Sequence, residues 1–344
     1  MNDLIFDNAY RNIESVDFSK LRNKKVLLTG CTGLIGINLL SVLKILNNLY
    51  DYNIQIYCLV HNEPKPPFNT FLKDCFVITG DLTKTDSVDY LLNIFSEEQN
   101  GVDYIIHTSG YAQPKKFMED KIGTVLLNTK TIFDLFKLLN PNGSFLFLSS
   151  SELYSGLDVE NITEDCIGTS TPDHPRACYI ESKRCGETIV NAYREKGYNA
   201  KIARVSLTYG PGTKKNDCRV MSDFVAKCLV EGKINLMDDG QSIRTYCYIS
   251  DTTEMLWNIL LHGKDNVYNV SGNSKISILE MANKIAKKLN CKVSVPDNNK
   301  DSLKGNPKIV NVSSKKYLDE FGKKQFVSID DGIEKVVEWI KVFF

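Results

Sequence analysis

Short runs of apolar residues alternate, along the first half of the chain, with segments whose apolar residues recur at helical spacing. Helical spacing is found at 34–46 and 124–139. The short apolar runs are typical of strands, and they lie at 24–30, 53–61, 75–81, 102–110 and 143–151. Buried strands that alternate with helices predict a parallel sheet that is covered by helices on both faces.

The second half of the chain is less regular. We expect a further strand at 198–206, followed by the turn-rich loop TYGPGTKKND. Helical spacing of apolar residues predicts helices at 220–232, 277–289 and 329–344. The sequence contains no internal repeat, so a single α/β fold with an irregular C-terminal part is predicted.

Charge and composition exclude several classes of function. The chain has 344 residues, and its 42 Lys and Arg balance its 42 Asp and Glu. This balance gives no support to nucleic-acid binding. No apolar run reaches the roughly 20 residues of a membrane span, and the N-terminus lacks the apolar core of a secretory signal. A cytoplasmic protein without membrane or nucleic-acid partners is therefore predicted.

Ten cysteines are scattered along the chain, and no two are spaced as C-x-x-C. Zinc sites and redox pairs usually show such local spacing. We therefore expect no metal site and ten reduced thiols, as in other cytosolic proteins.

The segment TGCTGLIG places Gly30, Gly33 and Gly36 between a predicted strand and a predicted helix. Glycines in this context allow a tight turn and a close approach of the backbone to a pyrophosphate. The N-terminus of the helix then provides free N–H groups and the positive end of a dipole. This motif predicts dinucleotide binding.

An acidic residue after the second strand normally binds the 2′-hydroxyl of the adenosine ribose in such folds. Here that place reads LVHNEPK, with His61 and Asn62 and no aspartate. Asp81, at the end of the next strand, is a candidate acceptor for the amino group of the adenine. The sequence therefore favours neither NAD nor NADP.

Tyr179 and Lys183 lie four residues apart in a predicted helix, so their side chains share one face. A neighbouring ammonium stabilises a phenolate, and we expect it to lower the pKa of Tyr179. Such a tyrosine is a general base for a sugar or alcohol hydroxyl. Upstream, FLFLSSSELYSG ends a predicted strand with three serines, which can share the substrate proton.

From residue 24 to the C-terminus the chain resembles the extended short-chain dehydrogenase/reductase family, in its branch that modifies nucleotide sugars. The resemblance rests on TGCTGLIG, GDL, VDYIIHTSG, SSSELY, CYIESKRCGE, RVSLTYGPG, NDCRV and DDGQSIRTYCYISD. It implies a Rossmann-type doubly wound parallel sheet with a smaller C-terminal α/β lobe for the substrate. The expected parts are an N-terminal extension (1–22), a dinucleotide-binding domain (23–206, with a return segment near 245–265) and a nucleotide-sugar lobe (207–344).

The resemblance also implies site residues. Ser150, Tyr179 and Lys183 match the catalytic triad of the family; Ser150 is selected over Ser149 and Ser151 by alignment on Tyr154. The expected cofactor is NAD, with NADP as the alternative. The cofactor-binding positions are Gly30, Thr32, Gly33, Leu34, Ile35, Gly36, His61, Asp81, Leu82, Thr108, Ser109, Gly110, Tyr179 and Lys183.

Members of this family begin by oxidising the sugar at C4, and the groups around C5 and C6 determine the later steps of the reaction. The pair Ser151 and Glu152 resembles that of UDP-glucuronate decarboxylases and also that of GDP-mannose 4,6-dehydratases, whereas PRACYIESKR and NDCRVMSDF are more similar to the decarboxylases. Decarboxylation of a UDP-uronic acid is therefore our leading hypothesis, with Glu152 and Ser151 handling protons or water. A 4,6-dehydratase and a 4-epimerase are alternatives, and a non-catalytic dinucleotide sensor is an alternative of another class.

The substrate-binding candidates are Arg219, Arg244, Pro114 and Lys116, and the family resemblance implies a homodimer. A guanidinium can hold a pyrophosphate with paired hydrogen bonds. Two positions depart from the family pattern. Leu207 replaces a usually polar residue, and Gly305 replaces a common arginine, for which Lys304 or Lys308 is a possible substitute.

Overall fold

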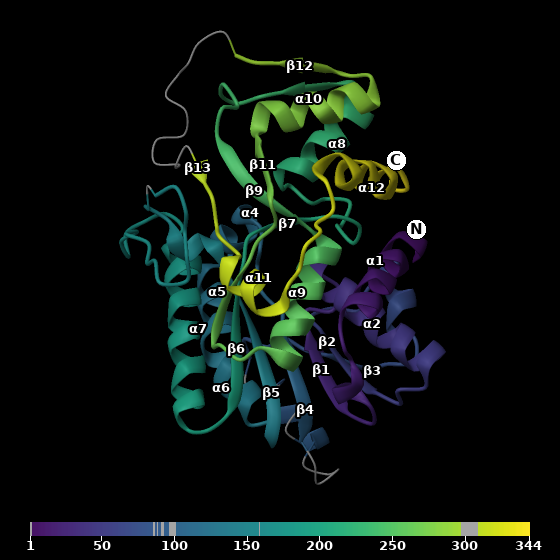
Figure 1. Cartoon of the computed structure of the whole chain (residues 1–344), viewed down its shortest axis with the longest axis vertical. Helices are drawn as coiled ribbons and strands as arrows, with labels where there is room; N and C mark the ends of the chain where they lie inside the picture. Colours follow the sequence, from purple (N-terminus) through teal and green to yellow (C-terminus); the bar gives the residue numbers. More distant parts are fainter. Residues whose placement is uncertain are drawn as a thin grey trace.

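The computed structural model describes residues 2–84, 87, 89–90, 93–95, 101–157, 159–296 and 309–344. A large body built on a seven-stranded sheet occupies the lower part of Figure 1, and a smaller lobe lies above it. Both chain termini lie on the same side of the molecule, where the body and the lobe meet (Figure 1).

All seven strands of the large sheet are parallel, in the order β10-β6-β5-β4-β1-β2-β3. Their bounds are β1 (Lys25–Thr29), β2 (Gln55–Val60), β3 (Phe76–Thr79), β4 (Val102–His107), β5 (Leu139–Ser150), β6 (Asn199–Val205) and β10 (Val267–Val270). Leu28 of β1 pairs with Cys58 on one side and with Ile106 on the other. The apolar runs in the sequence correspond to these strands because the inner strands are buried on both faces, whereas three of the four residues of the edge strand β3 are exposed. This arrangement confirms the predicted doubly wound fold.

Two groups of helices cover the two faces of the sheet. One face packs against α1 (Asn2–Ser15), α2 (Leu34–Tyr50) and α9 (Ile249–His262). The other face packs against α5 (Lys121–Asn128), α6 (Lys130–Phe136) and α7 (Ala177–Glu195). Figure 1 shows the first group to the right of and in front of the sheet, and the second group to its left.

The segment 124–139, predicted as one helix, is divided. Thr129 has φ −130° and ψ −79°, outside helical geometry, so α5 ends at Asn128 and α6 begins at Lys130. The β-branched Thr129 bonds the carbonyl of Val125 through its own hydroxyl, which competes with the helix backbone. Periodicity alone did not predict this break, because the apolar spacing continues across it.

The N-terminal residues form helix α1, which packs on α2 and α9. Asn8 donates to Asn38 Oδ1 at 3.2 Å, and Asn38 donates in turn to the carbonyl of Pro211 at 2.9 Å. Both asparagines are almost fully buried. Helix α1 is therefore joined, through α2, to the loop that leads into the smaller lobe.

The smaller lobe contains two further sheets. In the first, β9 (Ile243–Tyr248) pairs with β7 (Leu207–Tyr209), β11 (Ser274–Ser277) and β13 (Ile309–Val310). The second pairs β8 (Lys233–Asn235) with β12 (Lys292–Ser294). The helices of this part are α8 (Val220–Glu231), α10 (Ile278–Leu289) and α12 (Ile329–Lys341), whereas α11 (Lys315–Phe321) packs on β10 of the body.

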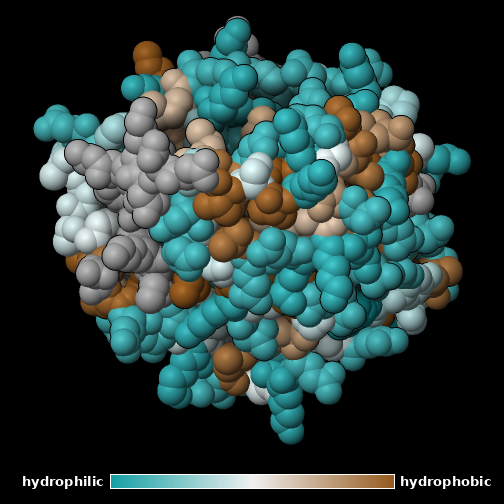
Figure 2. Space-filling view, turned by 90° about the horizontal axis from the view of Figure 1, so that it is seen from above, coloured by the Kyte–Doolittle hydropathy of each residue, from teal (hydrophilic) through white to brown (hydrophobic). Residues whose placement is uncertain are grey.

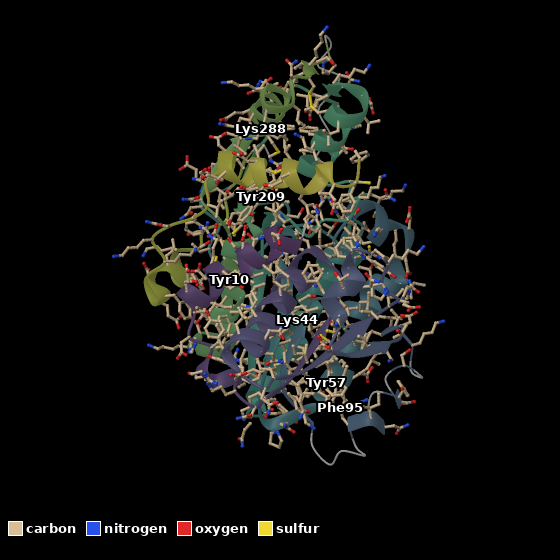
Figure 3. The ribbon with its side chains drawn as sticks, turned by 90° about the vertical axis from the view of Figure 1, so that its right-hand side faces the viewer. Tyr10, Lys44, Tyr57, Phe95, Tyr209 and Lys288 are labelled. Atoms are coloured by element: carbon tan, nitrogen blue, oxygen red, sulfur yellow. A yellow bond between two sulfur atoms is a disulfide. The ribbon has the colours of Figure 1, made fainter. Side chains whose placement is uncertain are left out.

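The surface of this lobe is largely polar. Figure 2, seen from above, shows hydrophobic areas that are interrupted by hydrophilic residues. Figure 3 places Lys288 in the upper part of the molecule and Tyr209 below it, toward the larger body. Tyr209 is buried and packs edge-on against Tyr246 and Tyr248 of β9, so aromatic packing joins β7 to β9.

One pair of cysteines corrects the expectation of ten reduced thiols. Cys228 of α8 and Cys291, just after α10, form a disulfide across a separation of 63 residues, with Cα atoms 5.8 Å apart. Packing of α8 against α10 brings the two thiols together. No local spacing signals such a pair, and for that reason the sequence did not predict it.

The part of the chain that the structure describes includes no helix with the length and apolar character needed to cross a membrane. Within those same residues, no group of three or more His, Cys, Asp or Glu side chains is arranged to hold a metal ion.

Candidate active site

The turn between β1 and α2 is built for close backbone contact. Gly30 has φ +67°, a conformation that favours glycine, and a Cβ there would lie 2.8 Å from the backbone nitrogen of Ser109. A Cβ on Gly36 would lie 2.2 Å from the carbonyl oxygen of Gly30. Gly33 is the N-cap of α2 and has no side chain with which to cap it. The glycine spacing in the sequence therefore has a direct steric cause.

The first turn of α2 carries the predicted positions Leu34 and Ile35, with Thr32 in the preceding turn. No side chain among the described residues caps the N–H groups at this helix end. Uncapped N–H groups and the helix dipole suit a pyrophosphate. The residues present therefore fit the phosphates of a dinucleotide.

Thr108, Ser109 and Gly110 follow β4 and face this turn. The Thr108 hydroxyl donates to the carbonyl of Thr29 at 2.6 Å, and the Ser109 amide donates to Thr29 Oγ1 at 3.1 Å. Gly110 lies close to the triad, because a Cβ there would be 3.9 Å from Lys183 Nζ. The ends of β1 and β4 thus form one continuous edge beside Lys183.

His61 and Asp81 lie together after β2 and β3. His61 Nδ1 is 4.0 Å from Asp81 Oδ1, and the side chains are 61% and 28% exposed. Burial opposes ionisation of Asp81, but hydrogen bonds from Thr83 and the nearby His61 outweigh it and lower its pKa. Leu82, next in the chain, is buried and its carbonyl accepts from Thr131. This edge of the site therefore presents a partly exposed carboxylate.

The strand–helix pair β5 and α7 brings Ser150, Tyr179 and Lys183 together. Ser150 ends β5, and its hydroxyl is hydrogen-bonded to the phenol of Tyr179. The same oxygen accepts from the Glu152 amide at 3.2 Å. Lys183 Nζ donates to the carbonyl of Leu148 at 2.6 Å and lies 5.8 Å from the centre of the Tyr179 ring. Ser149 is buried with no hydrogen-bond partner for its hydroxyl, so Ser150 is the serine that contacts Tyr179.

The pKa of Tyr179 shifts in the opposite direction to the one expected. Burial raises it to about 12, although the Ser150 hydrogen bond and the charge of Arg219 act against this. Burial also lowers the pKa of Lys183 to about 7, opposed by the charge of Glu187. Desolvation therefore outweighs the attraction between ammonium and phenolate in this structure.

Phe117 explains much of this burial. It belongs to the short helix α4 (Pro114–Glu119), and its ring stacks on that of Tyr179 at 4.8 Å with an interplanar angle of 12°. Its backbone carbonyl accepts from the thiol of Cys178. Pro114 and Lys116 begin the same helix, so two predicted substrate-binding residues are carried by the element that covers the tyrosine.

Glu152 lies just beyond Ser150, in a turn of 3-10 helix at Ser151–Tyr154. One nitrogen of Arg176, Nη1, contacts both Glu152 carboxylate oxygens at 2.7 Å. Arg176 is the N-cap residue of α7, three residues before Tyr179. Sequence reasoning assigned no role to this arginine, although the segment PRACY contains it. Its position directly before the helix that carries Tyr179 and Lys183 was the available signal.

Arg244 and Arg219 approach the same region from the smaller lobe. Arg244 lies on β9, where burial lowers its pKa, and its charge interacts with those of Glu152 and Arg176. Arg219 is the N-cap residue of α8 and is held by Asp217 with N–O distances from 2.6 to 3.1 Å. The structure therefore brings three guanidinium groups near Tyr179 and Glu152.

A buried ion pair between Arg204 and Glu187 joins α7 to β6. Arg204 of β6 binds Glu187 of α7, with Nη2 at 2.8 Å from Oε2, and donates to the Tyr154 hydroxyl at 2.8 Å. Tyr154 donates in turn to Asn269 at 2.7 Å. Glu187 lies one helical turn after Lys183. These contacts fix the orientation of α7 relative to the end of β5.

Leu207, the apolar replacement noted in the sequence, begins β7 and is 41% exposed. It pairs with Tyr246 on β9, two residues from Arg244. The second departure, Gly305, and its possible substitutes Lys304 and Lys308 lie outside the described residues.

Comparison with known proteins shows which family the sequence is similar to. The sequence model of the "NAD dependent epimerase/dehydratase family" matches residues 26–271. UDP-glucuronic acid decarboxylase 1 of Danio rerio is 28% identical over 243 residues, which cover 69% of this chain and 57% of the relative. The chain spans about half the length of the curated relatives that it matches.

Solved structures share the fold across nearly the whole chain. A UDP-glucose 4-epimerase of Thermotoga maritima superposes with a TM-score of 0.77 at 18% identity, covering 93% of this chain and 99% of that one. A UDP-glucuronic acid 4-epimerase of Bacillus cereus gives a TM-score of 0.74 at 21% identity, covering 93% and 100%.

Proposed function

The chain belongs to the NAD dependent epimerase/dehydratase family, and we propose that it is an NAD-dependent enzyme that decarboxylates UDP-glucuronate. The observation that carries the reaction is the contact between Glu152 and Arg176. A lone Glu152 carboxylate would repel the carboxylate of a uronic acid. With Arg176 bound to it and Arg244 nearby, the net charge of this group is positive, which favours an anionic sugar.

The preference for NAD is inferred from the residues that follow β1, β2 and β3. The N–H groups that begin α2 hold the pyrophosphate, and Asp81 with His61 faces the adenosine ribose. Because the Asp81 carboxylate repels a 2′-phosphate, NAD is favoured over NADP. Mass spectrometry of the gently purified protein tests this: NAD is expected, and bound NADP would contradict it.

Tyr179 and Ser150 act on the sugar C4 hydroxyl. Tyr179 accepts the hydroxyl proton while Ser150, already hydrogen-bonded to the phenol, holds the oxygen. Bound NAD supplies the oxidising and then the reducing equivalent at C4. The positive charge of Arg219 and the Ser150 hydrogen bond both favour the phenolate and so oppose the effect of burial.

Oxidation at C4 makes the sugar a β-keto acid, which loses its carboxyl group as carbon dioxide. The electrons of the broken C5–C6 bond pass toward the C4 oxygen, where the Ser150 and Tyr179 hydroxyls stabilise the charge. Glu152 and Ser151, on the turn after β5, are the groups that we propose return a proton to C5. Arg244 and Arg219 hold the diphosphate or the carboxylate of the substrate.

The test uses UDP-glucuronate labelled with a heavy carbon isotope at C6. Labelled carbon dioxide and a UDP-pentose are expected, and Tyr179→Phe serves as the inactive control. Formation of a 4-keto-6-deoxy product from a nucleotide hexose would instead identify a 4,6-dehydratase. Inversion at C4 without carbon dioxide release would identify a 4-epimerase, and no turnover of any nucleotide sugar would favour a binding protein.

We also propose a homodimer, formed through α5 and α7. The groove between these helices is mainly apolar, with Val125, Ala177 and Cys178 among its lining residues, and Ile122 nearby is 76% exposed. A second copy of the same pair of helices would cover this surface. Light scattering on the wild type and on Val125→Asp tests it: a dimer and a monomer, respectively, are expected. The cytoplasmic location expected from the sequence stays a prediction.

A further inference from the structure

Three cysteine thiols form a row on the sheet face that α2 covers. Cys58 of β2 pairs in register with Val77 of β3, so Cys75, two residues before Val77, lies on the same face. The Cys58 thiol hydrogen-bonds to the thiols of Cys75 and Cys31. The row therefore runs from the segment before β3, inward to the turn that follows β1.

The two ends of this row differ in exposure. Cys31 and Cys58 are fully buried, whereas Cys75 is partly exposed. Cys75 precedes β3 by one residue and follows Asp74, which has φ +65°. Its backbone is outside the strand ladder, so it can move toward Cys58 more easily than a residue inside the strand.

The surroundings of Cys75 favour its thiolate. A hydrogen bond from Cys58 lowers the pKa of Cys75, and the ammonium of Lys44 on α2 acts in the same direction. Lys44 reaches this edge of the sheet, with its Nζ bonded to the carbonyl of Lys73 and 3.9 Å from Asp74. Figure 3 shows Lys44 in the body, between the labels of Tyr10 above it and Tyr57 below it.

The inner end of the row belongs to the dinucleotide turn. Cys31 lies between Gly30 and Gly33, and its thiol faces the carbonyl of Leu59 at 3.9 Å. The Cα of Cys31 would be 2.8 Å from a Cβ on Gly36. With so little space, a shift of Cys31 moves the turn relative to the N-terminus of α2.

We propose that Cys75 and Cys58 form an oxidation site for hydrogen peroxide, and that closing their disulfide weakens dinucleotide binding through Cys31. The predicted effect of the disulfide on dinucleotide affinity rests on the proposed function. The oxidation of the thiol pair itself does not.

The chemistry is a two-electron oxidation. The Cys75 thiolate attacks one peroxide oxygen, the O–O bond breaks, and a sulfenic acid and hydroxide form. The Cys58 sulfur then attacks the Cys75 sulfur, losing its proton, and the sulfenic oxygen leaves as water. The two thiols are oxidised and peroxide is reduced to two waters. The Cys58 sulfur then has no proton to share with the Cys75 and Cys31 thiols, and its new bond draws it toward Cys75 and away from Cys31.

The experiment treats the full-length protein with hydrogen peroxide and maps its disulfides by mass spectrometry of peptides. A Cys58–Cys75 link that dithiothreitol reverses is expected, alongside Cys228–Cys291. Calorimetry with NAD should then show at least about fivefold weaker binding by the oxidised protein, the lower end of typical coupling between sites. Failure of Cys58 and Cys75 to link would overturn the proposal.

Two variants keep the test decisive. Cys75→Ser removes the accessible thiol and should bind NAD equally well before and after peroxide. Cys185→Ser removes a thiol on α7, on the opposite face of the sheet and in the groove of the proposed dimer, and should respond to peroxide like the wild type. A link that forms without any change in NAD affinity would refute the coupling. If the reduced wild type binds no NAD, the proposed cofactor is wrong. The peptide map then decides by itself whether Cys58 and Cys75 form a disulfide.

Discussion

A single nitrogen of Arg176, Nη1, bridges both carboxylate oxygens of Glu152 at 2.7 Å. Their side chains are 30% and 35% exposed, so solvent screens the pair and its contribution to stability is small. Its value lies in orientation, because Arg176 begins the helix that carries Tyr179 and Glu152 follows the strand that carries Ser150. The pair thus joins the two elements of the triad at their ends.

Arg176→Ala should reduce kcat for carbon dioxide release by up to roughly 100-fold. Without Arg176 the Glu152 carboxylate loses its partner and no longer keeps its position relative to C5 and C6 of the sugar. NAD affinity should not change, since Arg176 is on the substrate side. Single-turnover kinetics and calorimetry measure the two effects. Arg194→Ala, which removes an arginine at the far end of α7, is the matched control. Equal losses in both variants would contradict the role of Arg176.

Tyr179→Phe should lower kcat by about 10²- to 10⁴-fold, the range for loss of a general acid–base group. The ring that stacks on Phe117 is retained, so the thermal midpoint and NAD affinity should stay close to those of the wild type. Turnover and thermal unfolding are the measurements. Retention of full turnover would exclude Tyr179 as the base.

Lys183 should make stability rise with pH above neutrality. Burial lowers its pKa to about 7 from 10.5, so between these values the unfolded chain binds more protons than the folded one. Stability therefore increases from pH 7 upward, by at most about 1.4 kcal/mol per pH unit from this group. Urea unfolding at several alkaline pH values should show this slope for the wild type but not for Lys183→Met. Identical slopes of stability against pH in the two proteins would contradict a lowered pKa of Lys183 in the folded state.

Gly36→Ala should abolish detectable NAD binding, because the new Cβ would meet the Gly30 carbonyl at 2.2 Å and push α2 away from the turn. Gly197→Ala is the control. Gly197 also has a positive φ, +95°, but nothing lies within 4 Å of its Cβ position. The control should lose only about 1 kcal/mol of stability from backbone strain and keep its affinity for NAD, as calorimetry will show.

Glu187→Gln should destabilise the fold by about 3 kcal/mol or more, because it leaves the largely buried guanidinium of Arg204 without its partner charge. Chemical denaturation measures this loss. Glu181→Gln, which breaks a more exposed pair with Arg184 on the same helix, should cost less than about 1 kcal/mol. A reversed order of these two effects would contradict the supporting role of the Arg204 pair.

Much of the fold and part of the site could be predicted from local sequence. Buried strands and glycine spacing predicted the parallel sheet and the phosphate turn, since both depend on neighbouring residues. The shared face of Tyr179 and Lys183 followed from helical geometry. Their pKa directions did not, because the stacking of Phe117 and the depth of burial depend on packing between distant elements.

The contacts that sequence reasoning missed join segments far apart in the chain. Glu152 and Arg176 are separated by 24 residues, and Cys228 and Cys291 by 63. Nothing in the spacing of such residues indicates that they meet. The break at Thr129 was missed for another reason: a side-chain hydrogen bond overrode an apolar pattern that was correct on both sides of it.

Three of the passages of the chain between the body and the lobe have almost no connecting residues. One residue, Ser206, separates β6 of the body from β7 of the lobe, and β9 leads from Tyr248 directly into α9. The Ser206 amide donates to the carbonyl of Val270, where β10 leaves the body. The three passages, at β6–β7, at β9–α9 and at the end of β10, are therefore short connections between the same two parts. We expect passages this short to restrict sliding and separation of the two parts more than a tilt about the line that joins them.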